Sequence, residues 1–200
     1  MATQEARRAL TRSAVIEAAE RLFGSEGFGS TTMDDIAVEA GVTKGAVYHH
    51  FKSKREVFEA VFEAVSSDLA GAVMHEVRPR GDIIEMLMSS TRLFFDLCAN
   101  PATSRILLQD GPAVLGPQDW QRLDARHFGG LVTASLRMAM DAGAITHQPL
   151  EPLSNIMLAA IQAAALNCAA SPDFQSAAAL YSAAFGSILF GLSASANVRP

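Results

Sequence analysis

The sequence lacks the features that mark several classes of protein. Its two cysteines, Cys98 and Cys168, are too few for a disulfide scaffold or a cysteine-rich zinc site. No basic start followed by an apolar run opens the chain, so we expect no secretory signal. The most apolar stretches, 156–170 and 177–192, are shorter than the roughly 20 residues that a membrane-spanning helix needs, and polar residues interrupt them. We therefore expect a cytoplasmic protein, and neither a membrane, a secreted nor a fibrous one.

Charge is also scarce, and it is unevenly placed. Charged residues make up 18% of the chain against 50% hydrophobic residues, which is enough to bury a core. All three lysines lie between residues 44 and 54. Residues 1–55 hold eight basic and seven acidic side chains, a balance of +1, whereas residues 56–200 hold eight and fourteen, a balance of −6. The net charge of −5 excludes a uniformly basic nucleic-acid binder but leaves a local basic cluster, which could also be an ordinary solvated surface.

Strand patterns are missing as well. No segment sustains the alternation of a β-strand, whereas apolar residues recur at spacings of three and four, which predicts an all-α fold. Glycines, prolines and capping motifs divide the chain into about nine helices, with turns at 110–112 and 116–117 and a break at Pro79. We expect these helices near residues 7–25, 32–41, 43–51, 54–78, 82–99, 101–109, 117–142, 152–170 and 172–192.

Residues 32–51 hold the most informative pattern. Two short helices meet at Gly41, which can adopt the left-handed conformation of a tight turn. Thr32 with Asp35 resembles a capping box for the first of them, and Thr43 can cap the second. Such a pair is typical of a helix-turn-helix, whose second helix enters the major groove of DNA.

The outer face of that second helix is polar, small and aromatic. Gly45 is a poor helix former, but beside Ala46 it lets a partner approach the backbone closely. The apolar positions that would hold the two helices together are Ile36, Ala37, Ala40, Val42, Val47 and Phe51. The pattern indicates a helix that meets base edges.

The run from Thr31 to Glu56, which reads TTMDDIA, then AGVTKGAVYHHFKSKRE, resembles the TetR family of transcriptional regulators. The resemblance covers about 50 N-terminal residues. It implies a three-helix helix-turn-helix DNA-binding domain over residues 7–55 and a helical effector-binding and dimerisation domain over residues 56–200. The stretch 105–116 also looks like a segment of some family members, but it does not name a ligand.

The family pattern implies a DNA contact for each of nine residues. These are Thr32, Thr43, Lys44, Gly45, Ala46, Tyr48, His49, His50 and Lys54. Lys44 would donate to guanine, and Lys54 would hold a phosphate together with the helix N-terminus that it opens. Arg7 and Arg8 would reach the flanking backbone from a mobile N-terminal arm. A few local cations would thus let an acidic protein bind double-stranded DNA.

Some of these residues also have plainer explanations. Tyr48 could pack at the surface, and His50 could be a packing residue. His49 and His50 are a poor metal pair, because adjacent helical residues point about 100° apart. Asp34 and Asp35 fit the start of a helix better than a contact with phosphate.

The larger half shows no site for chemistry. Metal-ligand spacing, nucleophile–base pairs and phosphate-binding loops are absent, so we expect no enzyme, no metal and no cofactor. Methionines and aromatic residues there form the core or, as the resemblance implies, line a pocket for a small effector. The pocket candidates are Met88, Phe95, Trp120, His127 and Leu131, with Trp120 and His127 seven apart on one helix face. Because charge is not clustered there, we expect an apolar effector.

The last two helices carry flat surfaces of small and apolar residues. They are either an intramolecular core or a homodimer interface, for which the candidates are Ala160, Ala163, Asn167, Ala184, Phe185 and Ile188. A dimer would present two reading helices to an inverted repeat.

We therefore expect a repressor that a small effector releases from a palindromic operator. A long helix that opens at the Ser53-x-x-Glu56 capping box would transmit the effector signal. The alternatives are a transcriptional activator, a corepressor-dependent regulator, or a ligand sensor that acts through a protein partner.

Overall fold

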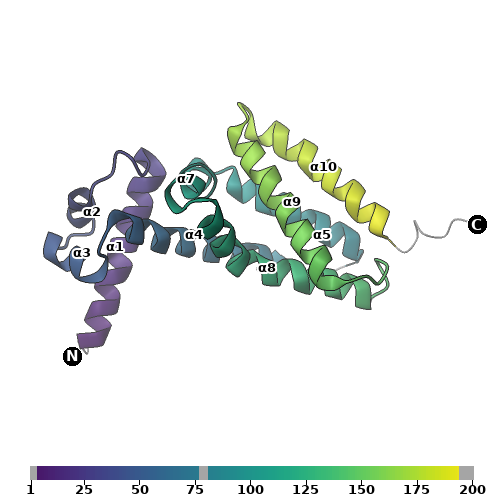
Figure 1. Ribbon diagram of the computed structural model, residues 1–200, viewed down its shortest axis with the longest axis horizontal. Coiled ribbons are helices and arrows are strands. Elements are labelled where there is room, and N and C mark those ends of the chain that lie inside the picture. The colour runs from purple at the N-terminus through teal and green to yellow at the C-terminus, as the bar shows by residue number, and fades with distance from the viewer. Residues whose placement is uncertain (1–3, 77–80, 194–200) are drawn as a thin grey trace, which may run out of the picture. The chain divides into compact units, whose positions relative to one another are not determined.

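The computed structural model describes residues 4–76 and 81–193, and these ranges are helical throughout apart from turns (Figure 1). They hold ten α-helices and one π-helix, of which α6, η1 and α7 follow one another without a break, so there are nine continuous helical segments. The strand pairing within these ranges is one isolated bridge between Ile145 and Ser193. The all-α expectation is therefore confirmed. The break expected at Pro79 lies outside the described residues.

The chain forms two compact units. The first unit holds residues 1–65 and 101–120, and the second holds residues 66–100 and 121–200. The segment 101–120 packs with the N-terminal helices, so these compact units differ from the two ranges on either side of residue 55. The functional division into domains over residues 7–55 and 56–200 stays a prediction. Sequence periodicity cannot reveal this packing, because the packing depends on contacts between residues far apart in the chain.

The first unit begins with three helices, α1 (Gln4–Glu26), α2 (Met33–Glu39) and α3 (Lys44–His50), followed by the start of α4 (Lys54–Glu76). Helix α1 starts earlier than we expect, so Arg7 and Arg8 lie in its first turns. The expectation that they belong to a mobile arm is wrong. The Thr11 hydroxyl donates to the Arg7 carbonyl at 3.0 Å, within a regular helix.

The capping signals of the helix-turn-helix act as their sequence predicts. The Thr32 hydroxyl accepts the Asp35 N–H, and the Asp35 carboxylate accepts the Thr32 N–H, which completes the capping box. Gly41 has a φ of 65° and turns the chain into Thr43, whose hydroxyl caps α3. Local hydrogen bonds therefore set the starts of α2 and α3 and the turn between them.

A cluster of aromatic rings lies at the centre of the first unit. Phe23 lies 5.3 Å from Phe58 and 5.7 Å from Phe28 between ring centroids. The helices around the cluster are α1, α2, α3 and the start of α4, and their buried side chains include Val15, Ala18, Ile36, Val47, Phe51, Val57 and Phe62. Burial of each large side chain stabilises the unit by about 1.5–3 kcal/mol.

Three short helical pieces complete the first unit: α6 (Pro101–Ser104), η1 (Arg105–Asp110) and α7 (Gly111–Leu115). Arg105 donates to the carbonyl oxygens of Gly24 and Ser25 at the end of α1. The Phe28 N–H donates to the Asp110 carboxylate at 2.8 Å. These contacts fasten the segment 101–120 to the last turn of α1 and the loop after it.

Close packing supports the same attachment. A Cβ atom added at Gly24 would lie 2.7 Å from the Cβ of Ala102, so α1 and α6 approach closely at this glycine. A Cβ atom at Gly111 would lie 2.9 Å from a backbone oxygen and 3.2 Å from the Phe62 ring. Trp120 is buried beside it, and its indole N–H donates to the Leu107 carbonyl at 2.8 Å.

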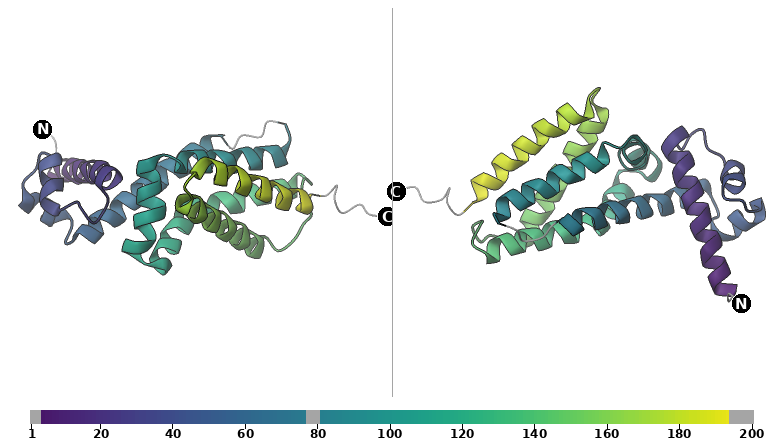
Figure 2. Two further views of the ribbon diagram at one scale, coloured as in Figure 1. Left: turned by 90° about the horizontal axis from the view of Figure 1, so that it is seen from above. Right: turned by 180° about the vertical axis from the view of Figure 1, so that it is seen from behind.

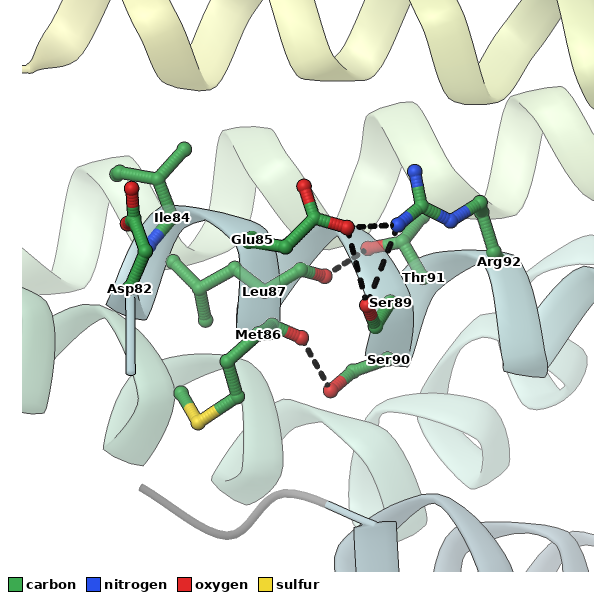
Figure 3. Close-up of polar contacts among 9 residues, drawn as sticks. All are labelled: Asp82, Ile84, Glu85, Met86, Leu87, Ser89, Ser90, Thr91 and Arg92. Carbon is green, nitrogen blue, oxygen red and sulfur yellow. Dashed lines mark hydrogen bonds and ion pairs between the residues drawn. The ribbon is translucent and has the colours of Figure 1, made fainter. Parts of the chain in front are cut away.

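The second unit contains α5 (Ile83–Cys98), the rest of α4, most of α8 (Pro117–Asp141), α9 (Leu150–Ala170) and α10 (Phe174–Leu192). Helix α10 packs against both α5 and α9 (Figure 2). The core of the second unit includes Met86, Leu87, Leu136, Ala139, Met140, Ile145, Leu153, Met157 and Leu189. Figure 3 shows polar contacts along α5, where Arg92 contacts both Glu85 and Ser89.

Candidate nucleic-acid interface

The outer face of α3 is accessible. Val47 is fully buried beneath it, whereas Lys44, Gly45 and His49 are exposed, and Tyr48 is 46% exposed. Ala46 and His50 are half-buried, and Thr43 and Thr32 are exposed at the two helix starts. The predicted contact residues of α3 are therefore at least partly exposed, and Val47 is the residue that holds this helix on the core.

Lys44 has an acidic partner in the free protein. Its Nζ lies 2.7 Å from Oδ1 and 3.0 Å from Oδ2 of Asp34, and both side chains are mostly exposed. The hydrogen bond to Asp34, followed by the charge of that carboxylate, raises the pKa of Lys44. Because the pair is exposed to water, salt or a competing anion weakens it readily. The ammonium group of Lys44 can therefore leave Asp34 for another acceptor at little cost.

Lys54 is held more firmly than Lys44. Its half-buried ammonium donates to the carbonyl oxygens of Phe28 at 2.6 Å and Thr31 at 2.7 Å, and it lies 4.2 Å from the centroid of the Phe28 ring. These contacts fasten the start of α4 to the loop between α1 and α2. The phosphate contact of Lys54 stays a prediction, and the structure adds a positioning role that the sequence does not indicate.

Arginines of α1 lie close to the end of α3. Burial lowers the pKa of His50, and the charges of His49, Arg8 and Arg12 lower it further. The guanidinium of Arg12 lies 5.2 Å from the centroid of the Phe51 ring. Arg12 is thus a candidate that our sequence reasoning missed, although its spacing of four from Arg8 within a helical segment places both on one face.

The two threonines use their hydroxyl groups inside the motif. The Thr43 hydroxyl accepts the Ala46 N–H at 3.2 Å. The Thr32 hydroxyl accepts the Asp35 N–H and donates to the Asp35 carboxylate at 2.7 Å, and these hydrogen bonds lower the pKa of Asp35. Their first role is therefore to shape α2 and α3.

Gly45 differs from Gly41, the glycine of the turn, in its backbone conformation. A Cβ atom at Gly45 would meet only the Thr43 hydroxyl, at 4.0 Å, and its φ is not in the left-handed region. Gly41, by contrast, requires its positive φ. Within the described residues no contact or backbone conformation demands a glycine at position 45, and its contact with DNA stays a prediction.

The predicted effector residues do not all come together. Phe95 is buried, and Met88, His127 and Leu131 are half-buried in the second unit. Trp120 belongs to the first unit, is 4% exposed, and already uses its indole N–H. The spacing of seven residues does place Trp120 and His127 on one face of α8, but that helix contributes to both units.

The second unit contains a buried carboxylate that the sequence analysis missed. Asp124 on α8 is 9% exposed and accepts a hydrogen bond from the Gln162 amide of α9 at 2.7 Å. Burial raises the pKa of Asp124 to about 6. The available signal was an aspartate within an apolar stripe that also holds Leu123, Phe128 and Leu131.

The candidate dimer residues lie on α9 and α10. Ala163, Asn167, Ala184 and Ile188 are exposed, and Ala160 is half-buried. Phe185 packs against the core of its own unit. Three larger apolar side chains of the same two helices are also exposed: Ile156 is 65%, Leu180 74% and Phe190 66% exposed.

The exposed surface of α9 and α10 carries almost no charge. The range 150–192 contains only two acidic residues and no basic one. By length and composition both helices could span a membrane, contrary to our estimate from their apolar stretches. A large exposed apolar surface is typical of a contact with either a membrane or another protein.

Comparisons with known proteins agree with this geometry. The family model described as bacterial regulatory proteins, tetR family, matches residues 15–61, and the tetracyclin repressor-like C-terminal domain model matches residues 84–192. The HTH-type transcriptional regulator TtgR of Pseudomonas putida is 38% identical over 101 residues, which cover 48% of this chain and 47% of TtgR. The HTH-type transcriptional activator FasR of Mycolicibacterium smegmatis is 31% identical over 107 residues, 54% of this chain and 49% of FasR. The chain thus spans about half the length of these relatives.

A solved structure matches over the whole length. A TetR-family transcriptional regulator from Pectobacterium atrosepticum is 26% identical, has a TM-score of 0.85 and covers 100% of both chains. The N-terminal model covers the helix-turn-helix, and the C-terminal model covers more than half of this chain. The chain therefore belongs to the TetR family of helix-turn-helix transcriptional regulators.

Proposed function

We propose that this regulator is a cytoplasmic repressor that binds an inverted-repeat operator as a homodimer and leaves it when a small effector binds. The observation that supports this most is the accessible face of α3, with Lys44 at its start and arginines of α1 near its end. Base contacts from α3 would specify the sequence, and the surrounding cations would hold the phosphates.

Within the interface the residues have separate roles. Lys44 exchanges Asp34 for a guanine edge, and Gly45 with Ala46 allows close approach to a base. Tyr48, His49 and His50 contact the sugar–phosphate backbone. Lys54 keeps α4 in register with the loop before α2 and reaches a phosphate with its remaining donor capacity.

The apolar surface of α9 and α10 supports the dimer. A membrane would also cover such a surface, but the family of this chain favours a second copy. Small residues such as Ala163 and Ala184 permit close helix approach, and exposed Ile188 and Leu180 supply area to bury.

The segment 101–120 supports a route for the effector signal. It is bonded to α1 through Arg105 and to the following loop through Asp110, while the chain enters it from α5 and leaves it along α8. An effector that binds one state of the second unit more tightly would shift the population of DNA-binding states.

Selection of bound fragments from a random DNA pool tests the proposal. The full chain should enrich an inverted repeat whose half-sites lie about one helical turn, roughly 34 Å, apart or somewhat more. Enrichment of no sequence, or of a single unrepeated site, would refute operator binding by a dimer.

A second function has support from one relative, because FasR is named an activator. The response of the operator complex to effector in a gel-shift assay discriminates the cases. Release indicates a repressor of the proposed kind, tightening indicates a corepressor, and unchanged binding with altered transcription indicates an activator. A sensor that acts through a protein partner would bind no operator at all.

A further inference from the structure

We propose that Asp124 anchors the effector in the second unit and that the effector is an amphiphilic organic cation, an apolar body carrying one protonated amine. The proposal rests on the effector response proposed above, and it adds the chemical class of the effector and the residue that recognises it.

The placement of Asp124 is the first observation. Asp124 is buried on α8, directly after buried Leu123 and four residues before buried Phe128. Its hydrogen-bond partner is the neutral amide of Gln162, which satisfies a lone pair but does not balance a charge. Buried charges are normally paired, because an isolated ion loses its hydration. A cation would supply the missing balance.

A second buried polar atom lies one turn further along α8. The Nε2 atom of His127 is buried and, within the described residues, has no hydrogen-bond partner. Positions three apart share a helix face, so His127 and Asp124 present the imidazole and the carboxylate to the same side of α8. A protonated amine has three N–H donors and can serve a carboxylate and a neutral imidazole together.

The surroundings suit the apolar body of such a ligand. The Phe94 and Phe128 rings meet edge to face at 5.4 Å, and Phe95 is buried beside them on α5. Aromatic faces attract cations, and they cover apolar groups. His127 and Leu131 are only half-buried, so this face of α8 is not sealed from solvent.

The test uses three molecules that share one apolar body. These are 4-phenylbutylamine, 4-phenylbutanol and 4-phenylbutyrate, titrated into the full chain at pH 7.5 in a calorimeter. We expect the amine to bind at least about tenfold more tightly than the alcohol, and the acid to bind most weakly, because a charge-assisted hydrogen bond exceeds a neutral one. Equal binding of amine and alcohol, tighter binding of the acid, or binding of none would overturn the proposal.

Matched variants locate the preference. Asp124→Asn keeps the shape of the side chain and should abolish the preference for the amine while retaining the alcohol. Asp141→Asn removes the same charge from an exposed position of the same helix and should change neither. An amine preference that survives in Asp124→Asn would refute the anchor.

A measurement on the unaltered chain covers the case of a variant that fails to fold. The amine stays protonated between pH 7.5 and pH 5, so its preference over the alcohol should decrease as Asp124 takes up a proton. Burial raises the pKa of both Cys98 and Cys168, so these neighbouring thiols stay protonated. A preference that does not change with pH would contradict the anchor.

Gel shifts separate this site from the function on which it rests. Amine binding through Asp124 with release of operator DNA supports both proposals. Amine binding through Asp124 without release confirms the site and refutes the effector response.

Discussion

Lys44 and Lys54 lie ten residues apart, but their ammonium groups have different surroundings. Lys44 holds an exposed carboxylate of Asp34, whereas Lys54 is half-buried over two backbone carbonyls and the Phe28 ring. Water competes with the first set of contacts more strongly than with the second. The structure thus gives Lys54 a positioning role at the start of α4, whereas recognition of DNA by Lys44 stays a prediction.

Lys54→Ala should destabilise the protein as well as weaken DNA binding. Loss of two charged hydrogen bonds to carbonyl groups lowers the free energy of unfolding by about 1–3 kcal/mol. Urea denaturation measures this change. Lys52→Ala, a change at an exposed lysine two residues before α4, is the control and should leave the midpoint unchanged.

The salt dependence of binding decides how much of the role of Lys54 is direct. A phosphate contact predicts that Lys54→Ala weakens binding to all sequences and flattens the plot of affinity against salt. An unchanged urea midpoint together with a flatter plot would assign Lys54 to phosphate alone and contradict its positioning role.

Asp124→Asn should stabilise the protein at neutral pH. A pKa raised from 3.8 to about 6 by burial corresponds to about 3 kcal/mol that the folded state loses when the carboxylate ionises. The stabilisation of the protonated form is complete below pH 3.8 and is lost as the pH rises through about 6. The variant should therefore melt at a higher temperature than the wild type at pH 7.5, and the difference should shrink toward pH 5.

Calorimetric melting at the two pH values measures this difference. Comparing the variant with the wild type cancels the titration of the groups that are common to both. A variant that is less stable than the wild type at pH 7.5 would show that the hydrogen bond from Gln162 outweighs the burial of the charge.

The sequence predicts individual residues well where their partners are local. Thr32, Thr43 and Gly41 have the roles expected of them, because caps and turns involve residues at most four apart. The partners of Lys54 lie 23 and 26 residues away, and that of Asp124 lies 38 away. Such contacts depend on packing, which residue spacing does not encode.

At the scale of elements, the segment 101–120 belongs to the first unit, and the chain enters it from α5 and leaves it along α8, both of which contribute to the second unit. Within the first unit the segment contacts the end of α1, where Arg105 meets carbonyl groups and Gly24 meets Ala102. It also contacts the start of α4, where Arg55 donates to the Leu115 carbonyl and the Asp119 carboxylate. Glycine fits position 24 because α1 and α6 leave no room there for an added Cβ atom.

Gly24→Ala should loosen this attachment. The added methyl would lie 2.7 Å from the Cβ of Ala102, so the backbones of α1 and α6 must separate, at a cost of about 1–3 kcal/mol in stability. Gly29→Ala is the matched control, because an added Cβ there meets no atom within 4 Å. Equal urea midpoints for the two variants would contradict the close packing of α1 on α6.

The sequence did not predict the form of this segment. Gly111-Pro112 is a typical turn pair, but Pro112 lies in the first turn of α7, where a missing N–H breaks no hydrogen bond. The helix continues through the π-helical η1, which single-residue spacing does not distinguish from an α-helix. Gly116, with a φ of 80°, does form the expected turn.

At the scale of the whole molecule, we expect the exposed apolar face of α9 and α10 to be covered by a second copy of the chain. Leu180→Asp places a charge at the centre of that face, where Leu180 is 74% exposed. We expect the variant to sediment as a monomer in analytical ultracentrifugation while its circular dichroism stays helical, because a buried unpaired charge opposes association. Met74→Asp, at an exposed site on α4, should remain dimeric. A dimer that persists in Leu180→Asp would place the interface elsewhere.

Reading of DNA by α3 is tested by the affinity of Lys44→Ala for the selected operator and for random duplex of equal length. Loss of a base contact should weaken operator binding by about tenfold or more while changing random binding much less. Equal losses on both duplexes, or an unchanged operator affinity, would show that α3 does not read sequence through this lysine.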